Sequence, residues 1–295
     1  MTILVGIAAD DLEQGAVTLA VDLARASGEE LRVVTVIGRH AAAAGSPGEA
    51  EYRRYFASQA EHVLAAARQH IPDDVAATYA TVANRSTSAG LFAEAKAVGA
   101  RLFVLGSARD GLYGRVCTGS VTDRMLHSSP LPVAIAPRGL RTQSEGPADA
   151  IPRLSVAYAG KRDDALLGEA AAEAGTLHAG LRVLTLAVRS SLPMYSAGAM
   201  GEDTIVGTWL DQVGEEARAG LSALGVEGEV EGVRGPTWSD ALSFVRWERG
   251  ELLVLGSSRG VFERVFIGSR AAKILRHCPV PALIMPTHRK KRQKK

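Results

Sequence analysis

The sequence is poor in aromatic residues and in cysteine, and both shortages restrict the kind of protein it encodes. Phe, Trp and Tyr make up 5% of the 295 residues, whereas apolar residues as a whole make up 46%. An apolar content that depends on Ala, Val and Leu suits helices packed closely against a parallel sheet. The two cysteines, Cys117 and Cys278, cannot form a disulfide framework, which favours a reducing, cytoplasmic location.

The sequence also lacks a long uninterrupted apolar run. The longest apolar-looking stretch, Ala170 to Val188, contains Glu173 and Arg182 and is not expected to span a membrane. No signal peptide is expected, because Asp10 and Asp11 interrupt the first apolar run and no basic segment precedes it. With 22% charged residues, the composition excludes a disordered chain and indicates a globular one.

Excess basic charge is confined to the C-terminus. The chain has 34 Lys and Arg against 32 Asp and Glu, and six of the basic residues lie between Arg289 and Lys295. Without these six, 28 basic residues remain, and the body of the chain has a net charge of −4. This excludes a basic nucleic-acid-binding surface spread over the whole molecule. Residues 288–295 are predicted to form a basic tail, either a contact for nucleic acid or anionic surfaces or a solubilising appendage.

An internal repeat is the strongest feature of the sequence. Leu102–Arg109 (LFVLGSAR) matches Leu252–Arg259 (LLVLGSSR), and Ser129–Pro137 (SPLPVAIAP) matches Cys278–Pro286 (CPVPALIMP). A period near 150 residues means two copies of one domain rather than a solenoid. The predicted divisions are domain 1 over residues 1–138, a linker over 139–152, domain 2 over 153–287 and the tail over 288–295.

Each copy alternates apolar strands with amphipathic helices. In copy 1 the expected strands are Thr2–Ile7, Leu31–Ile37, Val75–Val82, Leu102–Leu105 and Pro132–Ala136, and the helices are Leu12–Ser27, Glu51–Gln69, Ser86–Val98 and Gly119–Ser128. In copy 2 the strands are Leu154–Tyr158, Leu181–Val188, Glu227–Val233, Leu252–Leu255 and Ala282–Met285, and the helices are Asp163–His178, Asp203–Ala223, Trp238–Trp247 and Ser269–His277. This pattern predicts an α/β fold with two doubly wound, five-stranded parallel sheets. Such sheets bind ligands at the carboxyl ends of their strands.

The loop after the fourth strand of each copy has residue types that suit phosphate binding. In copy 1, Gly106 ends a buried strand, and Gly119 and Ser120 begin a helix. Glycines there permit a positive φ and a close approach of the backbone to a ligand, and a helix start offers N–H groups to an anion. Arg109 or Arg115 supplies the positive charge. A tight turn with Ser120 as a helix cap is the plain structural alternative, and spacing alone leaves both open.

This loop and its surroundings resemble the universal stress protein family. The mark of that family is Gly-x2-Gly-x9-Gly-Ser/Thr after the fourth strand, followed by a helix and a Pro-x-Pro-Val strand. Copy 1 fits this spacing with Arg109 in place of the second glycine. Copy 2 has Gly260 near the second glycine, and its loop is one residue shorter. The resemblance covers the chain except for the linker and the tail, and a tandem pair is similar to the two-domain bacterial members.

The resemblance implies a stress-response protein that is not an enzyme, with ATP as the candidate ligand and an internal pseudo-dimer that can also form a homo-oligomer. ATP-binding members usually carry an Asp at the end of the first strand, where Ala8 and Ala159 stand here. In the family the last strands pair across the dimer, so Leu131–Ala136 and Val280–Met285 are expected to pair. The candidate ligand-binding residues are Gly106, Ser107, Arg109, Gly119, Ser120, Gly256, Ser257, Arg259, Gly260, Gly268 and Ser269.

Two other functions stay open, an interaction protein that needs no nucleotide because its sites are degenerate, and a slow ATP hydrolase. No catalytic or metal-binding residue is assigned, because the seven histidines show no metal-ligand spacing and no nucleophile, base and acid are brought together by the sequence. Cys117, close to Arg115 in the loop of copy 1, is either a reactive thiol or a small apolar filler.

Overall fold

A computed structural model describes residues 1–9, 14–38, 47–141, 151–188, 199–259 and 265–287. The predicted tail and most of the predicted linker lie outside the described residues. In copy 1 the elements are β1 (Thr2–Ile7), α1 (Gly15–Ser27), β2 (Glu30–Gly38), α2 (Pro47–His70), β3 (Ala77–Asn84), α3 (Thr87–Val98), β4 (Ala100–Gly106), α4 (Ser120–Leu126) and β5 (Val133–Ala136).

The elements of copy 2 follow the same order with one addition. They are β6 (Arg153–Ala157), the 3-10 turn η2 (Lys161–Asp163), α5 (Asp164–Thr176), β7 (Gly180–Val188), α6 (Ala199–Leu224), β8 (Glu229–Gly235), α7 (Trp238–Phe244), β9 (Leu252–Arg259), β10 (Val265–Ile267), α8 (Ser269–His277) and β11 (Ala282–Thr287). Strand β10 was not predicted. It is a three-residue strand that pairs antiparallel with the end of β9.

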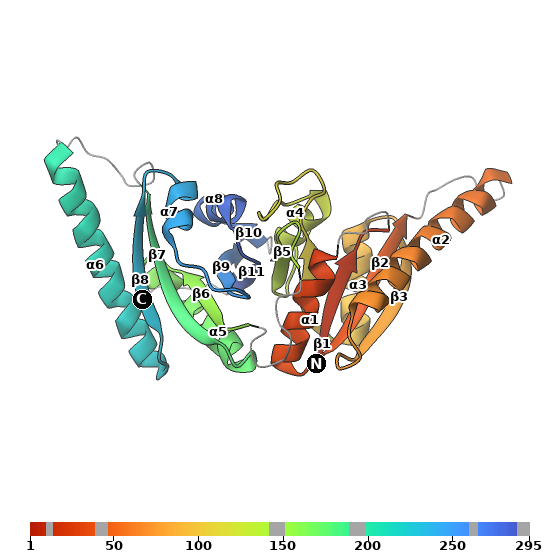
Figure 1. Cartoon of the computed structure of the whole chain (residues 1–295), viewed down its shortest axis with the longest axis horizontal. Coiled ribbons are helices and arrows are strands. Elements are labelled where there is room, and N and C mark those ends of the chain that lie inside the picture. Colours follow the sequence, from red (N-terminus) through yellow and green to blue (C-terminus); the bar gives the residue numbers. More distant parts are fainter. Residues whose placement is uncertain (10–13, 39–46, 142–150, 189–198, 260–264, 288–295) are drawn as a thin grey trace, which may run out of the picture.

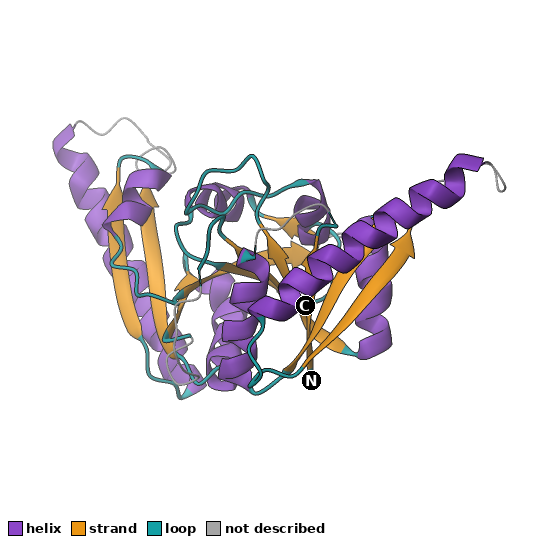
Figure 2. Ribbon diagram, turned by 45° about the vertical axis from the view of Figure 1, so that its right-hand side comes forward, coloured by secondary structure: helices purple, strands orange, loops and turns teal. Residues whose placement is uncertain are grey.

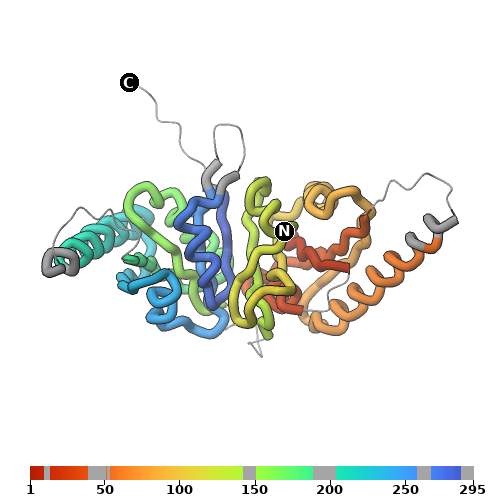
Figure 3. Tube along the Cα trace, turned by 90° about the horizontal axis from the view of Figure 1, so that it is seen from above, coloured from red at the N-terminus to blue at the C-terminus, as the bar shows by residue number. Residues whose placement is uncertain are grey.

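The two copies share one sheet. Its strand order is β3-β2-β1-β4-β5-β11-β9-β6-β7-β8, and the five strands of each half are parallel. The halves meet where β5 and β11 pair antiparallel, with Val133 opposite Ile284 and Ile135 opposite Ala282. These two strands lie side by side at the centre of the molecule (Figures 1 and 3). The predicted parallel sheets and the predicted pairing of the last strands are both confirmed.

Helices cover both faces of the sheet, as a doubly wound fold requires (Figure 2). Alternate strand residues point to opposite faces, so Ile3 and Val5 contribute to one apolar layer and Leu4 to the other. The first layer includes α1, α2, α5 and α6, and the second includes α3, α4, α7 and α8. Each layer contains residues of both copies, so the core is continuous across the junction. The long helices α2 and α6 extend beyond the sheet at its two ends (Figure 1).

Side-chain caps mark the starts of two helices, α3 and α7. Ser86 caps α3 by accepting a hydrogen bond from the N–H of Ala89 at 3.5 Å, as predicted. Thr237 and Asp240 form a capping box at the start of α7. The prediction that α7 extends to Trp247 was wrong, because the backbone becomes extended at Val245. The Trp247 indole N–H donates to the Leu242 carbonyl at 2.8 Å and holds the chain as it leaves the helix.

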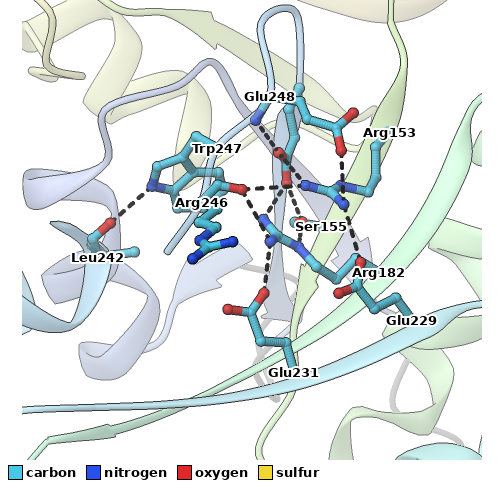
Figure 4. Close-up of polar contacts among 10 residues, drawn as sticks. Arg153, Ser155, Arg182, Glu229, Glu231, Leu242, Arg246, Trp247 and Glu248 are labelled. Atoms are coloured by element: carbon cyan, nitrogen blue, oxygen red, sulfur yellow. Dashed lines mark hydrogen bonds and ion pairs between the residues drawn. The ribbon is translucent and has the colours of Figure 1, made fainter. Parts of the chain in front are cut away.

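A buried ionic cluster lies at the amino ends of the copy 2 strands (Figure 4). Arg182 is 1% exposed and Glu251 is fully buried, and the two form an ion pair at 2.5 Å. Arg182 also donates to Ser155 Oγ at 2.7 Å and to Glu231 at 2.7 Å. Arg153 reaches the second oxygen of Glu251 at 3.1 Å. The ion pair and these hydrogen bonds compensate the cost of burying the charges of Arg182 and Glu251.

Candidate functional site

Copy 1 contains a cavity of about 360 Å³ at the carboxyl ends of β1 and β4. Its walls come from these two strands, from β2, from α1 and α3, and from the loop that joins β4 to α4. The lining residues are Gly6, Ile7, Ala8, Ala16, Val36, Thr87, Leu91, Leu105, Gly106, Ser107, Ala108, Arg109, Gly119, Ser120, Val121 and Thr122. All five candidate residues of copy 1 therefore lie around one cavity, at the edge where a parallel sheet binds its ligands.

The glycines around this cavity serve two different purposes. A Cβ on Gly6 would lie 2.8 Å from Leu105 Cδ2, so packing excludes a side chain there. A Cβ on Gly119 would lie 3.5 Å from the Ala108 Cβ, and one on Gly106 would lie 3.8 Å from the Ala16 Cβ. Both are ordinary contacts, so neighbouring residues do not require glycine at 106 or 119. What these two glycines provide is open space in the cavity.

The expectation that positive φ explains Gly106 and Gly119 was wrong. Gly119 has a φ of −85°, and Gly106 is not among the residues with positive φ. Within the described part of the loop, Gly114 adopts the left-handed conformation, with a φ of 69°. The loop thus turns at Gly114, which does not line the cavity. Gly106 and Gly119, which do line it, have backbone conformations that other residues also adopt.

Ser107 ties the loop to the sheet. Its hydroxyl donates to the Ala136 carbonyl on β5 at 2.7 Å and accepts from the Cys117 N–H at 3.1 Å. A bond from the Ala108 N–H to the Cys117 carbonyl, at 2.8 Å, closes the base of the loop. Ser257 repeats the first of these bonds in copy 2, because its hydroxyl donates to the Met285 carbonyl at 3.3 Å. Both hydroxyls hold the loop in place.

The far side of the loop is held by copy 2. Arg115 donates to the His277 carbonyl, and the Val116 N–H donates to the Cys278 carbonyl at 3.3 Å. These carbonyls belong to the C-terminal end of α8, where a cation is favoured by the helix dipole. Of the two arginines expected to supply positive charge, Arg115 is therefore bound to copy 2 and does not line the cavity. Arg109 does line the cavity, at its exposed mouth.

The start of α4 also lines the cavity. Gly119 is the cap residue and Ser120 is the first helical residue, so the structural alternative in which Ser120 caps the helix is not what the structure shows. Ser120 is exposed, and Thr122 donates to the Gly106 carbonyl at 3.3 Å. That bond joins the helix start to the end of β4. The two ends of the loop therefore have a fixed separation.

Strand register aligns the two copies residue by residue. Leu102 lies beside Ile3, and its counterpart Leu252 lies beside Leu154. The caps Ser86 and Thr237 align α3 with α7. By this alignment, four cavity-lining residues, Gly6, Val36, Thr87 and Val121, correspond to Ala157, Leu186, Trp238 and Arg270. All four are larger in copy 2.

Arg270 extends across the end of the copy 2 sheet. From the second residue of α8, its Nη2 donates to the Leu186 carbonyl at 2.9 Å. Its guanidinium carbon lies 5.7 Å from the centre of the Trp238 ring and 5.9 Å from that of Trp209. Burial lowers the pKa of Arg270 from its ordinary value, and the carboxylate of Asp163 partly opposes that shift. These side chains stand where copy 1 has open space.

The turn after β6 adds an acidic cluster to this region of copy 2. Asp163 accepts from the Ala159 N–H at 2.8 Å, and burial raises the pKa of its carboxyl. The Tyr158 hydroxyl is buried and donates to Asp164 at 2.6 Å, so burial and this carboxylate both raise its pKa. In the corresponding turn of copy 1, residues 10–13 lie outside the described residues.

The loop of copy 2 also differs in its backbone. Strand β9 continues to Arg259, and Ser257 to Arg259 pair with the three residues of β10. This hairpin uses backbone groups on both of its strands for pairing. Of the candidates in copy 2, Gly256 and Ser257 end the buried part of β9, Arg259 lies in the hairpin, and Gly268 and Ser269 start α8. Gly260 lies outside the described residues.

Arg270 and Trp238 were missed as site residues by sequence reasoning. The signal was present, because Arg270 follows Gly268 and Ser269 where Val121 follows Gly119 and Ser120. Metal chemistry receives no support from the described ranges, where no group of three or more His, Cys, Asp and Glu is placed to hold an ion. Of the helices in the described part of the chain, none is both long and apolar enough to cross a bilayer.

Comparison with known proteins supports the internal repeat. The family model described as "Universal stress protein family" matches residues 1–137 and again residues 152–286. A universal stress protein of Mycobacterium tuberculosis strain H37Rv is 35% identical over 303 aligned residues, which cover 97% of this chain and 100% of that protein. A universal stress protein of Mycobacterium bovis gives the same values.

Solved structures support the fold. The crystal structure of a universal stress protein from Archaeoglobus fulgidus matches with a TM-score of 0.64 at 18% identity, and covers 97% of this chain and 98% of its own. A putative universal stress protein from Pseudomonas aeruginosa matches with a TM-score of 0.57 over 97% of this chain and 93% of its own. Both therefore share the tandem arrangement over nearly their whole length.

Proposed function

The chain belongs to the universal stress protein family, and on that premise we propose that it is a non-enzymatic stress-response protein that binds an adenine nucleotide, ATP, in copy 1. The observation that carries the proposal is the cavity of about 360 Å³ between β1, β4 and the β4–α4 loop. Its position, its glycines and its size all suit a small phosphorylated ligand.

The two halves of the cavity suit the two ends of such a ligand. On the strand side, Ile7, Val36 and Leu91 offer apolar surface for a base. On the loop side, Gly106 and Gly119 leave room for phosphate to approach the backbone. Arg109 at the mouth supplies positive charge. Ala8 stands where ATP-binding members of the family usually carry an Asp, so recognition of the ligand depends more heavily on the loop.

Thermal unfolding with and without ATP tests the proposal. A ligand at about 100 times its Kd stabilises the folded state by about 2.7 kcal/mol, so ATP should raise the thermal midpoint. Gly119→Val should abolish this rise, because a branched side chain would fill the space between the loop and α4. Gly268→Val is the matched control, since a Cβ at the equivalent glycine of copy 2 meets nothing within 4 Å.

The outcomes separate the candidate functions. A rise with ATP that survives Gly268→Val and disappears with Gly119→Val supports nucleotide binding in copy 1. No rise at millimolar ATP would contradict it and favour an interaction protein that needs no nucleotide. Steady-state phosphate release from ATP, absent in the Gly119→Val variant, would instead indicate a slow hydrolase.

A further inference from the structure

The strongest difference between the two copies lies at the ends of their sheets. In copy 1 this edge is hollow, whereas in copy 2 Arg270 spans it and contacts the Leu186 carbonyl, Trp238 and Trp209. These contacts come from three different elements, β7, α7 and α6. A side chain held from three directions is a fixed part of the structure rather than a surface group.

Two of the three contact partners of Arg270 are equivalent to residues that line the copy 1 cavity. Leu186 corresponds to Val36, and Trp238 corresponds to Thr87. Trp238 is 7% exposed, so its ring fills volume that the smaller Thr87 leaves open. The guanidinium lies within cation–π distance of that ring and of Trp209. Trp238 and Arg270 therefore place an aromatic ring and a cation from the protein itself at this end of the copy 2 sheet.

We propose that Arg270 and Trp238 are the internal occupants of the second site and restrict the chain to a single nucleotide. This inference rests on the proposed function of copy 1. The base of a nucleotide would meet the Trp238 ring, and its sugar and phosphates would meet the Arg270 side chain. Entry would require both groups to leave, with loss of the bond to Leu186 and of two cation–π contacts.

The test converts the two residues to their counterparts in copy 1. The variant Arg270→Val with Trp238→Thr carries the side chains found at Val121 and Thr87. Equilibrium dialysis with ATP should give one nucleotide per wild-type chain and two per variant chain. Adding Gly119→Val should leave the variant with one nucleotide, now in copy 2. Arg276→Val is the matched control, because it removes a cation from the exposed face of the same helix.

Tryptophan fluorescence gives a second, independent measurement. All three tryptophans, Trp209, Trp238 and Trp247, lie in copy 2. The single variant Arg270→Val keeps all three, and ATP bound in its second site should change their emission. This variant also keeps the test valid if loss of the Trp238 ring prevents folding.

The results separate this inference from the proposed function. If the wild-type chain binds no ATP, the proposed function fails and the inference falls with it. If the wild-type chain binds two nucleotides, the proposed function stands and the inference is overturned. The inference is also overturned if folded Arg270→Val and double-variant chains still bind one nucleotide and their tryptophan emission is unaffected by ATP.

Discussion

The two copies have the same strand order but differ at both ends of their sheets. At the carboxyl ends, copy 1 has a cavity and copy 2 has Arg270 and Trp238. At the amino ends, copy 2 buries the Arg182–Glu251 cluster, whereas the equivalent Arg32 of copy 1 forms a partly exposed pair with Glu94 at 2.6 Å. The repeat preserves the apolar layers and diverges where polar side chains meet the strand ends.

One repeat position shows how far this divergence extends. Arg101 precedes the buried part of β4, and Glu251 occupies the same place before β9. Arg101 reaches Glu29 in its own copy and Glu173 of α5 in the other copy, at 2.5 and 2.9 Å. Glu251 pairs with Arg153 and Arg182 inside its own copy. In copy 1 the residue at this position, Arg101, therefore joins the two halves, whereas in copy 2 its counterpart Glu251 stabilises its own half.

Glu251→Ala should have the largest effect. It would leave Arg182, which is 1% exposed, without its closest partner, and breaking a buried ion pair from one side costs about 3–5 kcal/mol. Glu94→Ala is the control in copy 1 and should cost about 1 kcal/mol or less, because that pair is partly exposed. Urea unfolding measures both. Equal losses would show that the two clusters are energetically alike despite their different burial.

Arg101→Ala should come next. It removes hydrogen-bonded ion pairs to Glu29 and Glu173, and bonds to charged groups contribute about 1.5–3 kcal/mol. Because one of these pairs joins the copies, urea unfolding should also separate into two transitions, with tryptophan fluorescence following copy 2 alone. Arg25→Ala breaks a pair with the half-exposed Asp74 inside copy 1, and should keep a single transition. A single transition in Arg101→Ala would mean that the β5–β11 pairing alone couples the halves.

Arg115→Ala should have a smaller effect, on binding. Arg115 anchors the copy 1 loop to the His277 carbonyl, so its loss should weaken ATP binding by roughly fivefold to tenfold, equivalent to about 1 kcal/mol. Arg115→Lys should recover part of the affinity, because an ammonium group also donates to a carbonyl. Calorimetric titration with ATP measures the change. An affinity equal to that of the wild type would show that copy 2 does not position the loop.

Titration of His70 in copy 1 should give the smallest effect, a dependence of folding stability on pH. Its Nε2 lies 2.8 Å from Thr18 Oγ1, and burial lowers its pKa from the ordinary value of 6.5. The unfolded chain therefore binds this proton more readily, so stability should fall as the pH drops below about 6.5 and through the lowered pKa. Gly220 occupies the equivalent place in copy 2.

Urea unfolding at pH 8 and at pH 5.5, followed by circular dichroism, should show this loss. His70→Gln should reduce the difference between the two pH values, since it removes the titrating group and keeps a polar side chain. If the variant retained the full pH dependence, other groups would be responsible for it.

The sequence repeat made most of the fold predictable. The buried strands around Leu102 and Leu252, and the family spacing after them, placed the candidate loop at the carboxyl edge of the sheet, where copy 1 has its cavity. Strand β10 was not predictable in the same way, since three residues carry too little periodicity and their pairing depends on β9. The end of α7 was also missed, because the bond from Trp247 to Leu242 forms only once the chain has turned.

Long-range contacts limited how much of the candidate site could be predicted from the sequence. Arg115 lies in a glycine-rich loop, so its sequence context suggests a phosphate, yet its partner is a carbonyl 162 residues away. Arg270 could have been noticed by aligning the copies, but its contacts with Leu186 and Trp238 depend on how α8 sits on the sheet. Residue type and spacing therefore located the loop that lines the copy 1 cavity, and tertiary packing decided which side chains face that cavity.

Because β5 and β11 pair inside one chain, the two halves of the sheet can accumulate different substitutions. In an assembly of identical subunits, every substitution is copied to each symmetry-related position, so a residue that closes one site closes them all. Here the two sides of the pseudo-twofold are encoded separately, and a codon change at position 270 leaves position 121 untouched. Each half is also synthesised attached to its partner, so a half without a ligand site would still be inherited as a structural support for the other.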